Sequence, residues 1–198
     1  MRMAAELSTT FPSEGITTRL AGWLLPGQFS QDWALEQLNV LPYQHLLEVG
    51  YGSGKMLQAV AKKLKIGFIA GIDHSVSMYQ RALKRNRRAV EDQLLQLHIG
   101  SLHQLPYPSH YFHTIYGTNI HLSWKDPAME FLRLSNLLRA GGRLVTILQP
   151  QWPLQEKAVR NTMEKIQEYY MEAALTDIRI RYKDADGLTG VAITGYKV

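Results

Sequence analysis

A glycine-rich turn followed by a distant acidic residue carries the clearest chemistry in this sequence. The turn reads EVGYGSGK over residues 48–55, and Asp73 stands at the end of the next apolar segment. Glycine lets a backbone adopt positive φ and approach a ligand closely. A carboxylate about 20 residues after such a turn can accept hydrogen bonds from both hydroxyl groups of a ribose. The two features together predict a site for a cofactor that contains a nucleoside.

Three classes of cofactor bind such turns, and the spacing separates them. A P-loop has four residues between its first glycine and Gly-Lys, and Ser or Thr follows the lysine. Here Gly50 and Gly54 are one residue too close, and Met56 replaces the hydroxyl that would bind magnesium. A dinucleotide fingerprint requires Gly or Ala at the position of Lys55. The spacing therefore disfavours both a nucleoside triphosphatase and an NAD enzyme.

The turn lies within an alternating series of strands and helices. Helical spacing predicts helices with Ser75 and Asp126 as N-caps, and predicts that Gly141-Gly142 ends the second of them. Two closely joined strands at the C-terminus should pair as an antiparallel hairpin. We therefore predict an α/β fold with a seven-stranded, mostly parallel sheet, an antiparallel C-terminal hairpin strand and helices on both faces. The predicted strands are residues 45–49, 68–72, 95–99, 112–116, 144–148, 178–182 and 191–196.

The glycine turn and its surroundings resemble class I S-adenosylmethionine-dependent methyltransferases. The closest resemblance is to the small-molecule subset that includes ubiquinone/menaquinone-biosynthesis-type enzymes, and it covers residues 40–150 best. Five segments in the family's order and spacing carry it: LLEVGYGSG (46–54), GIDHSVSM (71–78), GSL with LPY (100–107), WKDP (124–127) and LLRAGG (137–142). The resemblance implies a Rossmann-like class I methyltransferase fold, S-adenosyl-L-methionine as cofactor and S-adenosylhomocysteine as product.

The resemblance also implies which residues bind the methionine part of this cofactor. Gly50, Gly52 and the loop backbone would face it, and Glu48 would support the loop and the amino group. Thr118 and Asn119, which end the fourth predicted strand, would lie near the same amino group. The full set of cofactor-binding residues that the resemblance implies is Glu48, Gly50, Tyr51, Gly52, Gly54, Asp73, His74, Met78, Ser101, Leu102, Thr118 and Asn119.

The nucleoside part would bind further along the sheet. The resemblance implies that Asp73 holds the ribose hydroxyls, that His74 and Met78 border the adenine, and that Ser101 and Leu102 lie at the adenine edge. The family often has Asp where Ser101 stands, and that Asp accepts a hydrogen bond from the adenine amino group. Serine keeps an acceptor oxygen but loses the charge-assisted strength. A second departure is Phe112-His113, where the family often has Phe-Asp.

The catalytic candidate is His121. Methyl transfer from a sulfonium mainly requires alignment and desolvation, together with a base where the acceptor must lose a proton. His121 follows the fourth predicted strand, where the acceptor lies in this fold, and would act as base or orient the acceptor. Tyr51 either lines the acceptor pocket or packs against the N-terminal segment. No metal site is predicted.

Composition limits the acceptor. The 198 residues contain no cysteine, which excludes the cysteine-dependent methylation of cytosine C5. The net charge is +5, and the basic run at 84–88 is more typical of a solvated helix end than of a nucleic-acid site. We expect a small-molecule methyl acceptor, no nucleic-acid or membrane partner, a cytoplasmic location, and a monomer or homodimer.

The predicted domain organisation has two parts. Residues 1–40 form an N-terminal helical segment and candidate substrate lid, and residues 41–198 form the S-adenosylmethionine-binding methyltransferase domain. Two other functions stay open at this point. One is a noncatalytic cofactor-binding or regulatory protein on the same fold, and the other is an RNA or protein methyltransferase.

Overall fold

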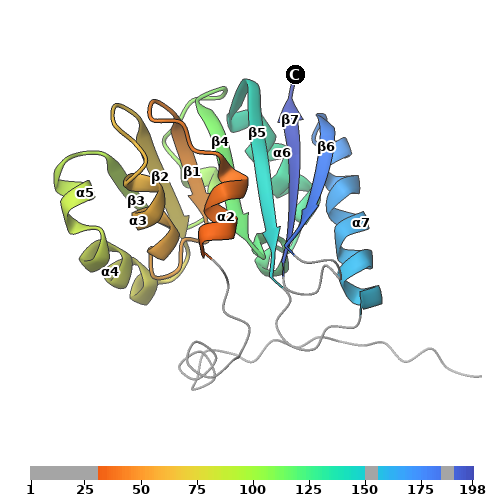
Figure 1. Cartoon of the computed structure of the whole chain (residues 1–198), viewed down its shortest axis with the longest axis horizontal. Coiled ribbons are helices and arrows are strands. Elements are labelled where there is room, and N and C mark those ends of the chain that lie inside the picture. The colour runs from red at the N-terminus through yellow and green to blue at the C-terminus, as the bar shows by residue number, and fades with distance from the viewer. Residues whose placement is uncertain (1–30, 150–155, 184–189) are drawn as a thin grey trace, which may run out of the picture.

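A seven-stranded sheet organises the structure, a computed structural model that describes residues 31–149, 156–183 and 190–198 (Figure 1). The strand order is β3-β2-β1-β4-β5-β7-β6. β1 to β5 pair in parallel, and β7 is antiparallel to both of its neighbours. The strands are β1 (His45–Val49), β2 (Phe68–Asp73), β3 (Leu95–Ile99), β4 (Phe112–Thr118), β5 (Leu138–Leu148), β6 (Leu175–Tyr182) and β7 (Val191–Lys197). The predicted fold class is confirmed.

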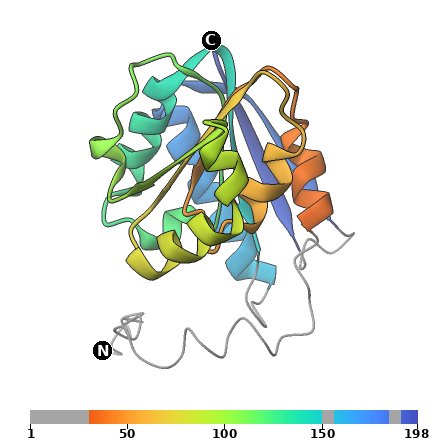
Figure 2. The ribbon, with the colours of Figure 1, turned by 90° about the vertical axis from the view of Figure 1, so that its left-hand side faces the viewer.

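Helices cover both faces of the sheet, and Figure 2 shows α2 on one side with α6 and α7 on the other. On the first side, apolar residues of α2, α3 and α4 pack on the sheet in one buried cluster. On the second side, Phe131 and Leu134 of α6 join Ile166 and Tyr170 of α7 in another. The helices are α2 (Gln31–Leu38), α3 (Lys55–Ala61), α4 (Val76–Arg85), α5 (Arg87–Glu91), α6 (Pro127–Leu137) and α7 (Glu156–Glu172), with short 3-10 turns η1 (Leu102–Gln104) and η2 (Ile120–Ser123).

The two predicted N-caps are confirmed. The side chain of Ser75 accepts a hydrogen bond from the Met78 N–H at 3.4 Å, and that of Asp126 accepts one from the Met129 N–H at 3.1 Å. Pro127 follows Asp126 in the first turn of α6, where a missing N–H costs nothing. These caps fix where α4 and α6 begin, beside the carboxyl ends of β2 and β4.

The prediction that Gly141-Gly142 ends a helix is wrong. α6 ends at Leu137, and Leu138 already has extended backbone and pairs with Phe112 in the sheet. The glycines lie inside β5, where the register with β4 shifts. A Cβ on Gly142 would meet three backbone carbonyl oxygens at 2.8–3.2 Å, so close strand packing explains this glycine.

The domain boundary at residue 40 stays a prediction. Residues 31–38 form α2 as expected, while residues 1–30, which hold most of the candidate lid, lie outside the described residues. In the part of the chain that the structure describes, we find no helix with the length and apolar character needed to span a membrane.

Candidate active site

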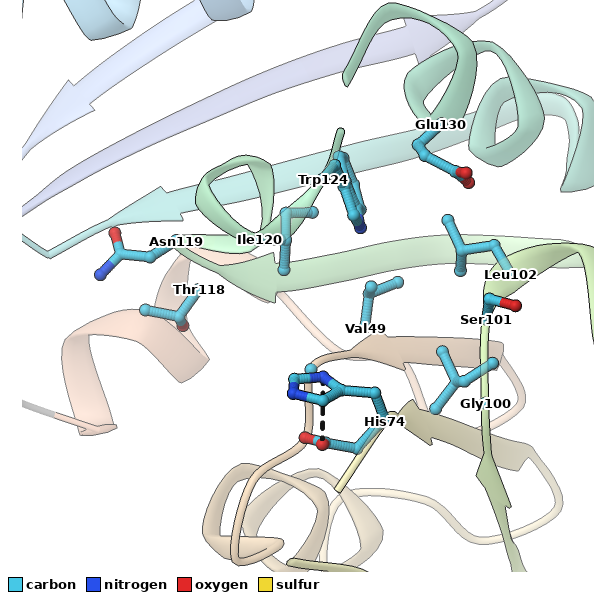
Figure 3. Close-up of a pocket in the computed structure, with 13 residues that line it drawn as sticks. Val49, His74, Gly100, Ser101, Leu102, Thr118, Asn119, Ile120, Trp124 and Glu130 are labelled. Carbon is cyan, nitrogen blue, oxygen red and sulfur yellow. Dashed lines mark ion pairs between the residues drawn. The ribbon is translucent and has the colours of Figure 1, made fainter. Parts of the chain in front are cut away.

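A pocket of about 350 Å³ opens where the parallel strands end at their carboxyl edge (Figure 3). Ligands of open α/β sheets bind at this edge, because the loops and helix N-termini gather there. Seven predicted site residues line the pocket: Gly50, Asp73, His74, Ser101, Leu102, Thr118 and Asn119. They come from the ends of four strands and from η1. The pocket is therefore the candidate site for the nucleoside-containing cofactor.

The glycine turn between β1 and α3 forms one wall of the pocket. Gly50, Gly52 and Gly54 all have positive φ, at 68°, 51° and 73°. The Gly54 N–H donates to the Tyr51 carbonyl at 2.9 Å and closes the turn. A Cβ on Gly52 would meet no atom within 4 Å, so the backbone is open to a ligand there. This open backbone fits the close approach that the sequence motif implies.

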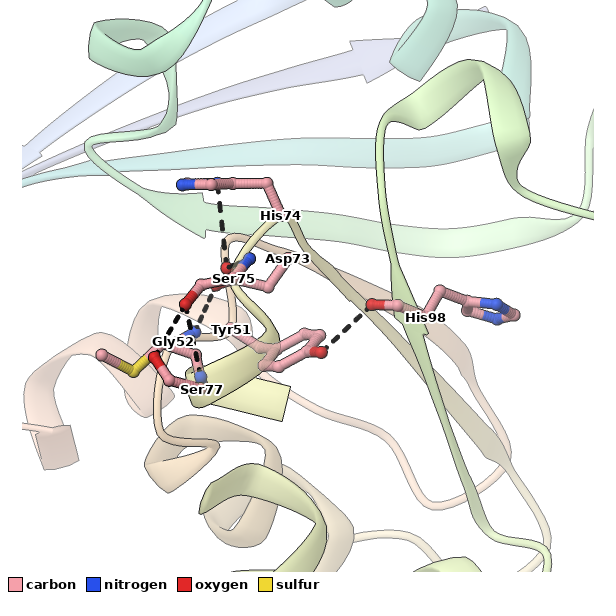
Figure 4. Close-up of polar contacts among 8 residues, drawn as sticks. Tyr51, Gly52, Asp73, His74, Ser75, Ser77 and His98 are labelled. Atoms are coloured by element: carbon pink, nitrogen blue, oxygen red, sulfur yellow. Dashed lines mark hydrogen bonds and ion pairs between the residues drawn. The ribbon is translucent and has the colours of Figure 1, made fainter. Parts of the chain in front are cut away.

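Asp73 anchors the turn from the end of β2 (Figure 4). Its Oδ2 accepts the Gly52 N–H at 2.8 Å, and its Oδ1 accepts the Ser75 N–H at 2.9 Å. The residue is only 8% exposed. Each carboxylate oxygen can accept a second hydrogen bond, so Asp73 can still receive both hydroxyls of a ribose. The exposed His74 lies beside it, with Nδ1 3.8 Å from Oδ1.

Helix α4 holds the turn from its other side. Arg85 Nε donates to the Ser53 carbonyl at 2.9 Å, and the buried Asn86 donates to the Gly54 carbonyl at 3.0 Å. A Cβ on Gly54 would lie 2.6 Å from Asn86 Nδ2 and 2.9 Å from the Ala82 Cβ. These close contacts explain why position 54, the third glycine of the turn, must be glycine.

Three of the four basic side chains in the run at 84–88 have partners within the protein. Arg85 is used by the turn, Arg87 pairs with Glu91, and Arg88 pairs with Asp92, each of these two pairs at i,i+4 spacing. Such pairs are typical of a solvated helix face. The geometry therefore favours the structural interpretation of the run over nucleic-acid binding.

Six of the predicted residues do not line the pocket: Glu48, Tyr51, Gly52, Gly54, Met78 and His121. For Tyr51, the interpretation that its side chain lines the acceptor pocket is wrong. Its ring packs against the position of Gly71, and its hydroxyl donates to the His98 carbonyl at 3.1 Å. The residue is 3% exposed, so it supports the turn from within the core.

Glu48 is buried on the α2–α3 side of the sheet. The Tyr116 hydroxyl donates to its Oε2 at 3.0 Å. Burial raises the pKa of Glu48 to about 8, and the hydrogen bond from Tyr116 offsets part of this shift. The carboxyl group therefore lies beneath the turn, where it can support the loop as the resemblance implies.

The end of β4 brings together Asn119 and His121. Asn119, at φ 53°, donates through Nδ2 to the Gln149 carbonyl at 3.0 Å and accepts the Gln149 N–H at 3.0 Å. Its amide thus joins the ends of β4 and β5. In η2, both ring nitrogens of His121 are buried and have no hydrogen-bond partner among the residues that the structure describes, and burial lowers the pKa of the ring to about 4.

Six lining residues were missed by sequence reasoning: Val49, Ile72, Gly100, Ile120, Trp124 and Glu130. Val49, Ile72 and Gly100 are immediate neighbours of predicted residues, and Trp124 lies within the WKDP segment. Glu130 carried a separate signal. It precedes Leu134 by four positions, and Leu134 faces the core, so a charged residue occupies the apolar side of α6.

The fold and the pocket define a Rossmann-like protein that binds a nucleoside-containing cofactor. A family model described as a methyltransferase domain matches residues 47–146, and the chain belongs to that family. The chain is therefore an S-adenosylmethionine-dependent methyltransferase, and S-adenosyl-L-methionine is its cofactor.

Individual relatives agree with this assignment. The chain is 24% identical over 181 residues to the uncharacterized methyltransferase YdaC of Bacillus subtilis, with 90% of this chain and 98% of that protein covered. A SAM-dependent methyltransferase from Aquifex aeolicus superposes with a TM-score of 0.69 at 15% identity, over 86% of this chain and 90% of that one. Phosphoethanolamine N-methyltransferase 2 of Haemonchus contortus, solved with phosphomonomethylethanolamine and S-adenosylhomocysteine, gives 0.67 at 17% identity, over 87% of this chain and 53% of that one.

The residues present fit this cofactor. The backbone of the turn at Gly50, which lines the pocket, suits the methionine part, and the Asp73 carboxylate suits a ribose. The cofactor supplies an activated methyl group on a sulfonium, so the protein's task is to align the two reactants and exclude water.

Proposed function

We propose that this methyltransferase acts on a small-molecule acceptor. The pocket carries the proposal: it has the size typical of small-ligand sites, and the apolar side chains of Val49, Ile120 and Trp124 are part of its lining. The structure of the Haemonchus contortus relative holds a small acceptor, phosphomonomethylethanolamine, which supports the same class here.

An RNA or protein acceptor has weaker support. A nucleic-acid site requires cations free to contact phosphates. Arg85, Arg87 and Arg88 instead have partners within their own region of the protein. The noncatalytic hypothesis is disfavoured by membership of the methyltransferase family.

The acceptor class can be tested with labelled cofactor. The protein would be incubated with methyl-tritiated S-adenosylmethionine and, separately, with small-molecule, RNA and protein fractions of a cell extract. We expect label in the small-molecule fraction, and we expect Asp73→Ala to abolish it. Label that appears only in RNA or protein would contradict the proposal, and label in no fraction would favour the noncatalytic hypothesis.

We also propose His121 as the base or acceptor-orienting group. Its low pKa keeps the imidazole neutral at pH 7 but also makes it a weak base, so the ring is better suited to accept a hydrogen bond that orients the acceptor than to take its proton. Both nitrogens lack a partner among the described residues, but both are buried and His121 does not line the pocket, so the role requires that the segment after β4 opens toward the acceptor. His121→Gln should lower kcat on an identified acceptor while S-adenosylhomocysteine affinity changes less than about twofold. Full turnover in this variant would rule out the role.

A further inference from the structure

Two acidic residues, Asp73 and Glu130, are among those that line the pocket, and Glu130 has few hydrogen-bond partners for its carboxylate. It lies in the first turn of α6, and its Oε2 is buried with no hydrogen-bond partner in the described part of the chain. The nearest recorded cation is Arg133, whose Nε lies 3.8 Å from Oε2. That distance is an ion pair but too long for a hydrogen bond. Because Oε2 is buried, a ligand in the pocket that donates a hydrogen bond would reach the carboxylate through its other oxygen, Oε1.

The geometry of a nucleoside indicates which part of the cofactor reaches Glu130. In S-adenosylmethionine the base and the methionine leave the ribose from opposite ends. If Asp73 binds the ribose and the turn at Gly50 faces the methionine, the base extends away from the turn. Figure 3 shows Glu130 at that far side, above Leu102 and Ser101. The exocyclic donor of adenine is its 6-amino group, and a carboxylate is a strong acceptor for it.

Ser101 is poorly placed to take this role. Its hydroxyl donates to Gln104 Oε1 at 3.1 Å and lies 3.0 Å from His103 Nδ1, while its N–H donates to the same Gln104 oxygen at 2.9 Å. The side chain thus serves as the cap of η1. Its hydroxyl is already engaged in the free protein and carries no charge.

Trp124 supports the same end of the pocket. Its ring packs edge-on against Phe131, with centroids 5.2 Å apart and an interplanar angle of 83°. Phe131 is fully buried beneath α6 and directly follows Glu130. An aromatic wall and a carboxylate therefore meet on the α6 side of the pocket. This pairing is suited to a flat, apolar base with one amino group.

We propose that Glu130 accepts a hydrogen bond from the 6-amino group of the cofactor and selects adenine over a 6-oxo base. This role rests on cofactor binding in the pocket described above. Glu130 replaces, from another helix, the carboxylate that Ser101 does not provide.

Calorimetric titration tests the proposal with two ligands, S-adenosylhomocysteine and its 6-oxo analogue S-inosylhomocysteine. The wild-type protein should bind the 6-amino ligand about 10- to 100-fold more tightly, because a hydrogen bond to a charged acceptor has that strength. Glu130→Gln should lose about tenfold in affinity for S-adenosylhomocysteine, and its preference should vanish or reverse, because the amide can donate to a 6-oxo group. Glu91→Gln, the same change on exposed α5, should keep both affinities.

A double variant and the wild-type protein provide the controls for this titration. Ser101→Asp added to Glu130→Gln should restore most of the preference for the 6-amino ligand. If Glu130→Gln keeps the wild-type ratio of affinities, or the wild-type protein shows no preference, the role of Glu130 is refuted while the cofactor site stands. If the wild-type protein binds neither ligand at millimolar concentration, the cofactor site itself is refuted.

Discussion

Replacing Asp73 by alanine tests the geometry of the cofactor site directly. In the free protein the carboxylate accepts two backbone N–H groups, from Gly52 at 2.8 Å and from Ser75 at 2.9 Å. In the complex it is also expected to accept the ribose hydroxyls. Hydrogen bonds to a charged group contribute about 1.5–3 kcal/mol. We therefore expect Asp73→Ala to weaken S-adenosylhomocysteine binding by about 1.5–3 kcal/mol, or about 10- to 150-fold in Kd.

The same substitution should also reduce stability without ligand. The two N–H groups lose a charged partner, but the turn is near solvent and water can replace part of the contact, so we expect a loss of about 1–3 kcal/mol. Calorimetry measures the affinity, and urea unfolding measures the stability. Asp92→Ala is the matched control, because it removes the same charge from an exposed position that pairs with Arg88. An unchanged Kd in Asp73→Ala would mean that the ribose binds elsewhere and that Asp73 only anchors the turn.

Two further predictions concern the turn and the acid beneath it. Gly54→Ala should destabilise the protein by about 2 kcal/mol or more, because position 54 has a positive φ and a Cβ there would lie 2.6 Å from Asn86. Gly52→Ala should cost only about 1 kcal/mol, because position 52 has a positive φ but open space around it. Equal losses of stability in urea unfolding would refute the role of the contact with Asn86. Burial raises the pKa of Glu48 from 4.5 to about 8, so the folded protein retains a proton that the unfolded chain releases between these pH values. The contribution of Glu48 to stability is complete below pH 4.5 and is lost as the pH rises through 8. Glu48→Gln should therefore raise Tm more at pH 8 than at pH 5. An equal effect on Tm at both pH values would contradict the raised pKa of Glu48.

Much of the fold could be predicted because each element carries its own local signal. The strands are short apolar runs, and the caps at Ser75 and Asp126 are side chains within the segments they begin. The error at Gly141-Gly142 has a different origin. A glycine pair that ends a helix and one that allows a bulged strand look alike in sequence, and only the pairing of Leu138 with Phe112 decides between them.

The site was predictable to the extent that it lies in continuous motifs. The turn at Gly50 and the acid Asp73 are such motifs, and both line the pocket. Tyr51 was ambiguous because alternate residues of a tight turn face opposite ways, and the core has room for its ring beside Gly71. The spacing to Leu134 places Glu130 on the apolar side of α6, but whether it reaches the pocket depends on how α6 is rotated against the sheet. Packing of Phe131 and Leu134 sets that rotation.

The two departures from the family pattern, at His113 and Ser101, could suggest a noncatalytic protein, and the structure bears on each of them. His113 stands near the start of β4, at the opposite end of the strand from the pocket, where its ring accepts the His45 N–H at 3.1 Å and lies 2.9 Å from an Arg139 nitrogen. A change there alters how the amino ends of the strands are held together and leaves the pocket residues in place. Ser101 does line the pocket, but the pocket retains a second carboxylate, that of Glu130. If Glu130 accepts the adenine amino group, as proposed above, the loss of an acidic residue at position 101 leaves that contact in place, and the comparison of Glu130→Gln with the wild-type protein tests this explanation.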